Sequence, residues 1–166
     1  RSEGRGGARM RAVTLAGGAW GRPGPLAFVG DHGSVDMFVS SDGGSLYFCS
    51  NRPLDGSGAA KGDTDIWVAR RAASGWGEPV NLGSAVNSAE NDYYPTLTAR
   101  GDLYFSSPRA GGIGGNDIYR SRLVDGRLGA AANLGGPVNT PRWEFAPFVA
   151  PDESFLLFAS AREGGL

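Results

Sequence analysis

The chain of 166 residues is long enough for one ordinary domain, and its 40% apolar residues can fill a hydrophobic core. Its formal net charge of −1 gives no electrostatic basis for binding nucleic acid, and no apolar run approaches the roughly 18 residues of a membrane span. The 28 glycines and 10 prolines favour short strands joined by tight turns.

The N-terminal residues comprise a short segment expected to be disordered and a stretch that matches part of a sequence repeat found further along the chain. Residues 1–8 are rich in glycine and charge, and we expect them to be disordered. Residues 9–14, followed by Trp20, match residues 65–70, followed by Trp76, without a gap. Residues from 9 onward are therefore predicted to form the last two strands of a repeated unit.

Two later stretches carry the same motifs in the same order. Leu46–Arg52, Asp65–Trp67, Asn81–Gly83 and Val86–Ser88 recur as Leu103–Arg109, Asp117–Tyr119, Asn133–Gly135 and Val138–Thr140, and a third copy begins at Leu156. Each full copy is predicted to hold four strands, at 37–40, 45–50, 65–70 and 80–82, and again at 95–98, 103–107, 117–122 and 132–134. A repeat of roughly 40–55 residues built from short strands is typical of propeller blades.

We therefore predict an all-β fold of four-stranded antiparallel β-propeller blades, in a partial, open propeller of about three blades. The expected boundaries are a half blade at 9–36, blades at 37–94 and 95–146, and a half blade at 147–166. Propellers close with typically four to eight blades, so this arc should leave strand edges unpaired. Missing blades of a longer parent chain, or a second copy, are the expected occupants of those edges.

Trp67 and Tyr119 hold equivalent positions in the two copies. A single blade cannot bury both of its faces, so we expect both rings to be buried where one blade packs on the next.

The combined motif resembles a known repeat family. Ser41-Asp42-Gly43, Leu46-Tyr47-Phe48 and Asp65-Ile66-Trp67 together resemble the TolB-type, WD-like propeller repeat of bacterial envelope proteins. The elements at 111–119 and 133–139 are similar to the subgroup often fused to OmpA-like peptidoglycan-binding domains. The resemblance implies a non-catalytic binding or scaffold module, periplasmic or extracellular and associated with the outer membrane. It implies an envelope protein, peptidoglycan or another glycan as partner.

An enzymatic alternative stays open at this point. The propeller could be an accessory domain of a serine peptidase or of a sialidase-like glycosidase whose catalytic part is not in this chain. Residues 40–47 partly resemble the sialidase Asp-box, with Leu46 in place of its Thr. His32 is the only histidine and no Gly-x-Ser-x-Gly elbow is present, so no catalytic residue is predicted here.

Charged residues recur at fixed points of the repeat. Arg52, Arg109 and Arg162 follow the second strand, and Asp65 and Asp117 open the third. Because these strands are hairpin partners, we expect Arg and Asp to meet, or Asp to bind nearby backbone, and so to pin the hairpin. The alternative is a ring of Arg and Asp that recognises a polar ligand.

Two acidic residues open the innermost strands. Asp92 and Glu144 stand where such strands face the central channel, the usual ligand mouth of a propeller. Simple solvation of a loop is the alternative interpretation. One histidine and one cysteine, Cys49, cannot form a usual zinc site, and the EF-hand pattern is missing around Asp63. No metal or cofactor is predicted.

Overall fold

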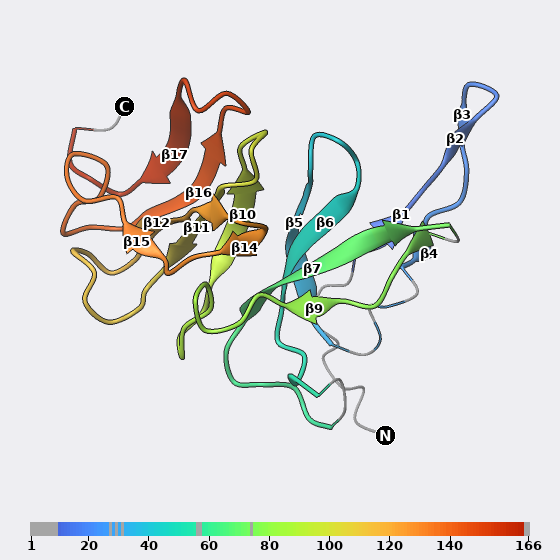
Figure 1. Ribbon diagram of the computed structural model, residues 1–166, viewed down its shortest axis with the longest axis horizontal. Coiled ribbons are helices and arrows are strands. Elements are labelled where there is room, and N and C mark those ends of the chain that lie inside the picture. The colour runs from blue at the N-terminus through green and yellow to red at the C-terminus, as the bar shows by residue number, and fades with distance from the viewer. Residues whose placement is uncertain are drawn as a thin grey trace.

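The computed structural model describes residues 10–26, 28, 30, 32–55, 58–73 and 75–164. These residues form antiparallel β-sheets joined by turns and loops (Figure 1). The described part of the chain contains no helix, and hence none long and apolar enough to cross a membrane. The segment 1–8, for which disorder is predicted, lies outside the described residues.

Seventeen strands are present in the described ranges. They are Arg11–Ala12 (β1), Leu15–Ala16 (β2), Ala19–Trp20 (β3), Gly24–Pro25 (β4), Ser34–Val39 (β5), Ser45–Ser50 (β6), Asp65–Ala72 (β7), Gly75–Trp76 (β8), Val80–Asn81 (β9), Tyr93–Leu97 (β10), Leu103–Ser107 (β11), Asp117–Ser121 (β12), Leu123–Val124 (β13), Arg127–Leu128 (β14), Ala132–Asn133 (β15), Glu144–Val149 (β16) and Leu156–Ser160 (β17).

The two central sheets share the pairing order of four strands, and the first sheet also contains β8, which pairs with β7. In the first, β5, β6, β7 and β9 pair in that order, and in the second β10, β11, β12 and β15 do the same. The register is also shared, because Phe48 pairs with Trp67 and Phe105 pairs with Tyr119, the positions that the sequence repeat equates. The prediction of two matching four-stranded units is confirmed at the level of strand pairing.

The ends of the chain supply parts of the same unit. Arg11 pairs with Pro25 across β1 and β4, as Trp67 pairs with Asn81 across β7 and β9. The β2–β3 hairpin, which projects away from the sheets in Figure 1, ends at Trp20 as the β7–β8 hairpin ends at Trp76. At the other end, β16 and β17 pair as the first two strands of a unit do.

The first strand of each unit begins earlier than the sequence predicts and contains a β-bulge. β5 begins at Ser34 rather than at residue 37, and β10 begins at Tyr93 rather than at residue 95. The bulge inserts an extra residue and interrupts the alternation of polar and apolar positions, so these strands start inside segments that do not read as strands. The residues with positive φ are equivalent in the three units: Asp36 (52°), Tyr94 (55°) and Ala146 (51°).

The first central sheet is buried on both faces. Tyr47, Cys49, Ile66 and Val68 point into a cluster shared with β10, β11 and β12. Alternate residues on the same strands point the other way, into a cluster that includes Met10, Phe28, Leu46, Phe48, Trp67 and Ala69. The predicted burial of Trp67 and Tyr119 is confirmed, at 3% and 4% exposure.

Candidate binding site

Arg109 ties the second strand of its unit to the start of the first. Its Nη2 donates to Asp92 Oδ1 at 2.5 Å and to the carbonyl of Val86 at 2.6 Å. Its Nε donates to Ser107 Oγ at 3.0 Å. The guanidinium lies 5.0 Å and 4.7 Å from the ring centroids of Phe105 and Tyr119, so it crosses the face of the hairpin. We call this arrangement the arginine staple.

The last unit repeats the staple. Arg162 Nη2 donates to the carbonyl of Val138 at 2.5 Å and lies 3.5 Å from Glu144 Oε1. Its Nε donates to Ser160 Oγ at 2.7 Å. Burial by itself raises the pKa of Glu144, but hydrogen bonds from Thr140 and Ser160 and the charge of Arg162 outweigh burial and lower it. Glu144 is therefore an ionised, structurally bonded carboxylate.

The first unit keeps the arginine and changes the carboxylate. Arg52 Nη2 donates to the carbonyl of Phe28 at 2.7 Å and lies over the rings of Phe48 and Trp67. At the position that Asp92 and Glu144 occupy, this unit has Ser34, whose hydroxyl bonds to Ser50.

The predicted pairing of these arginines with Asp65 and Asp117 is wrong. Asp117 accepts hydrogen bonds from the N–H of Ile113, the N–H of Gly114 and Nδ2 of Asn133. Asp65 accepts from Lys61 Nζ and from Nδ2 of Asn81. The arginine guanidinium lies across the aromatic rings and points towards the innermost strand. Asp65 and Asp117 instead face the loop that precedes their own strand. The Asp–backbone bond, the other expected way of pinning the hairpin, is present at Asp117.

The repeated Val-Asn motif is also accounted for by internal bonds. Asn87 Oδ1 accepts the N–H of Ile66 at 2.8 Å, and its Nδ2 donates to the carbonyl of the same residue at 3.0 Å. Asn139 makes the same two bonds to Ile118, at 2.8 Å and 2.9 Å. Each asparagine side-chain amide thus pairs with the backbone of the third strand as a neighbouring strand would. This role was not predicted from the sequence repeat.

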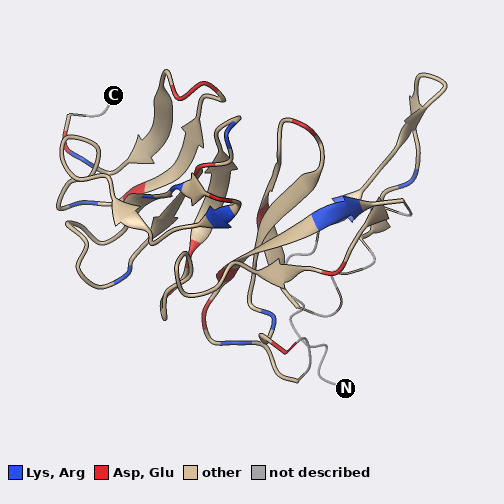
Figure 2. Cartoon of the chain, in the orientation of Figure 1, with Lys and Arg blue, Asp and Glu red and all other residues tan. Residues whose placement is uncertain are grey.

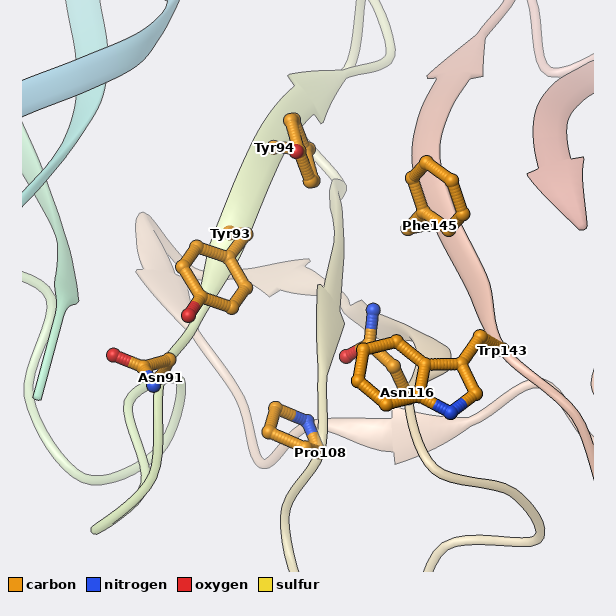
Figure 3. A pocket seen from close by; sticks show the side chains of 7 residues that line it. All are labelled: Asn91, Tyr93, Tyr94, Pro108, Asn116, Trp143 and Phe145. Carbon is orange, nitrogen blue, oxygen red and sulfur yellow. The ribbon is translucent and has the colours of Figure 1, made fainter. Parts of the chain in front are cut away.

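A pocket of about 370 Å³ lies where β10 and β16 begin. It is lined by Asn91, Tyr93, Tyr94, Pro108, Asn116, Trp143 and Phe145 (Figure 3). Residues 91 to 94 belong to one unit and residues 143 and 145 to the next, while Pro108 and Asn116 come from the loop between β11 and β12. The lining residues described carry no formal charge at neutral pH, although Asp92 and Glu144 are their immediate neighbours in sequence.

The glycine-rich loop before β12 allows Trp143 to reach this pocket. A Cβ on Gly115 would collide with the indole of Trp143, and a Cβ on Gly114 would collide with the backbone carbonyl oxygens of Thr140 and Arg142. Gly115 also donates its N–H to the carbonyl of Arg142 at 3.0 Å. The glycines therefore let the loop lie directly against the segment that carries Trp143.

The acidic residues singled out from the sequence lie beside the pocket but do not line it. It placed Asp92 and Glu144 at a ligand mouth, and both instead bond to staple arginines. The side chains that open into the pocket are their neighbours, above all Tyr93, Tyr94 and Trp143. The available signal was Tyr93 directly after Asp92, and Trp143 and Phe145 on either side of Glu144.

Lys and Arg residues are interspersed with Asp and Glu residues along the described part of the chain (Figure 2). Among the described residues, no group of three or more His, Cys, Asp or Glu side chains could hold a metal ion. No known family model matches the sequence, and a search of curated proteins finds no match.

Proposed function

We propose that this chain is a non-catalytic binding module made of TolB-like β-propeller blades, part of a periplasmic or outer-membrane-associated protein of the bacterial envelope. Two four-stranded units of one register, with matching partial units before and after them, support the blade assignment. The sequence motifs named above support the envelope assignment.

One observation supports binding over catalysis most directly. The charged residues that recur in the repeat bond to other groups of this chain, as Arg109 does to Asp92 and as Asp117 does to the N–H of Gly114. The concave, uncharged pocket beside them is lined by side chains suited to contact rather than to proton transfer. We infer that the partner binds across the starts of β10 and β16.

Co-sedimentation with isolated bacterial cell envelopes tests this function. The chain should pellet with envelopes, and Trp143→Ala, which removes a side chain 59% exposed at the pocket, should lose most of that binding. Trp20→Ala is the matched control, because Trp20 is 69% exposed on the remote β2–β3 hairpin. Failure to pellet, or equal losses in the two variants, would contradict the proposal.

Protease treatment of the envelopes before mixing separates the two expected kinds of partner. Binding that survives the treatment indicates peptidoglycan or another glycan, and binding that is abolished indicates an envelope protein.

A further inference from the structure

We propose that the pocket between β10 and β16 receives a pyranose ring of a neutral saccharide. This inference rests on the proposed function and specifies its ligand. The protein would hold the ring between tilted aromatic side chains and accept a hydrogen bond from one of its hydroxyl or amide groups.

Asn116 supplies an acceptor that lacks a donor. Its Nδ2 donates to the carbonyl of Glu144 at 3.0 Å, which fixes the orientation of the amide because a carbonyl can only accept. The residue is only 5% exposed, and its buried Oδ1 has no hydrogen-bond partner in the described part of the structure. Figure 3 shows this oxygen on the side of the pocket that faces Tyr93. A ligand with an O–H or N–H group would donate a hydrogen bond to this buried acceptor.

Asn91 offers the complementary group across the pocket. Its Oδ1 accepts the N–H of Thr64 at 2.9 Å, so its other polar atom, Nδ2, is a donor. The pocket therefore combines an amide acceptor with an amide donor on an otherwise mainly aromatic lining. Sugars carry both kinds of group on every ring.

The aromatic walls suit the apolar C–H faces of a sugar. The ring centroids of Tyr93 and Tyr94 are 5.9 Å apart at 45°, and those of Tyr94 and Phe145 are 6.4 Å apart at 40°. Because these rings are tilted, they do not cover one another's faces, and Trp143 keeps much of its indole exposed. A pocket of about 370 Å³ is at the small end of ligand sites, in keeping with one or two sugar rings.

Tyr94 is held in a conformation that bulky residues rarely adopt. Its φ is 55°, in the left-handed region, and the bulge in β10 fixes it there. The equivalent residues of the other units are Asp36 and Ala146, so the bulge itself does not demand an aromatic side chain. In this unit the bulge presents the Tyr94 ring to the pocket.

A peptide fits these observations less well. The uncharged lining gives no counter-charge for acidic or basic side chains. A proline-rich segment would match the aromatic rings, but each proline lacks the N–H that the Asn116 acceptor needs. The hydroxyls of Tyr93 and Tyr94 are protonated at neutral pH and can donate to sugar oxygens, and burial raises the pKa of both further.

The test is a titration of the whole chain followed by NMR, with three probes: a tetrasaccharide of N-acetylglucosamine, cellotetraose and a decaproline peptide. A saccharide should shift the side-chain resonances of Tyr93, Tyr94 and Trp143. Trp143→Ala should weaken saccharide binding by about tenfold or more, and Trp20→Ala should leave it unchanged.

Tyr94→Gly gives a second variant that should not disturb folding, because glycine adopts positive φ without strain. It should also weaken saccharide binding by about tenfold. Shifts with decaproline alone would overturn the sugar assignment in favour of a peptide.

The two proposals fail separately. If no saccharide shifts the pocket resonances while Trp143-dependent sedimentation with envelopes persists, the sugar inference is wrong and the binding module stands. If neither saccharides nor envelopes bind, both proposals are wrong.

Discussion

Arg109 is paired with Asp92, seventeen residues before it in the sequence, through a 2.5 Å contact between Nη2 and Oδ1. Asp92 is fully buried and the side chain of Arg109 is 15% exposed. The pair joins the start of the innermost strand to the end of its neighbour. The same guanidinium also binds the carbonyl of Val86, in the linker that leads into the unit.

Loss of the Asp92 carboxylate should destabilise the fold strongly. Asp92→Ala should lower the free energy of unfolding by about 3–5 kcal/mol, because it leaves a largely buried guanidinium without its counter-charge. Arg100→Ala breaks a pair with Glu153 in which Arg100 is 75% exposed, and should cost about 0–1 kcal/mol. Urea titrations of both variants measure the difference, and similar losses would show that the buried pair contributes little.

Glu144 should make stability depend on pH in the acid range. Because its pKa is lowered in the folded state from an ordinary 4.5, the carboxylate stabilises the fold above that value. This contribution is lost as pH falls through the folded pKa. The unfolding free energy of the wild type should therefore fall more steeply below about pH 5 than that of Glu144→Gln. Parallel curves for the two proteins would contradict the assignment.

Truncation of Trp67 should remove a large part of the core between β7 and the N-terminal strands. Trp67→Ala should cost about 3–5 kcal/mol, because the ring is nearly fully buried against Phe48 and Met10 in one cluster. Trp20→Ala, at an exposed ring, should cost no more than about 0.5 kcal/mol. A loss below about 1 kcal/mol for Trp67→Ala in a denaturant titration would show that the cluster is loosely packed.

Gly114 should not tolerate a side chain. Gly114→Ala places a Cβ against the backbone carbonyls of Thr140 and Arg142, which cannot move aside as a side chain could. The expected cost is about 1–3 kcal/mol of unfolding free energy. Gly62→Ala is the matched control, since no described atom other than those of its chain neighbours lies within 4 Å of the added Cβ. Equal thermal midpoints for the two variants would refute the packing argument.

The last strand should promote self-association of this chain. Within the described structure β17 pairs only with β16, and Leu157 is 60% exposed on it. Unpaired edges with apolar side chains invite pairing with another chain. Light scattering should show concentration-dependent association of the wild type and a clear reduction for Leu157→Lys. A wild-type protein that stays monomeric at high concentration would argue against this edge as an interface.

The sequence alone predicted the strand pairing that the spacing within each copy determines, and it missed the features that depend on how side chains pack. The pairing of Phe48 with Trp67 follows from spacing, because identical spacing in both copies implies one hairpin geometry. The partner of Arg109 did not follow, because adjacency on the hairpin suggested Asp117 while the aromatic rings direct the guanidinium elsewhere.

Packing between units also explains why the full lining of the pocket was not predicted. Asn116 and Trp143 are 27 residues apart (143 − 116) and come together only when one unit packs on the next. The bulge that turns Tyr94 was hidden as well, since positive φ at a tyrosine has no local sequence signature.

The β-bulge allows the side chain presented at one backbone position to differ from unit to unit. Asp36, Tyr94 and Ala146 differ in size and charge, yet their φ values agree within 4° (55 − 51). One backbone shape thus accommodates an anion, an aromatic ring or a methyl group at the same point. Substitution there can change what the surface presents while the hydrogen bonds of the sheet stay in place. Evolution, or a protein engineer, therefore has three sites at which recognition can be rewritten one residue at a time.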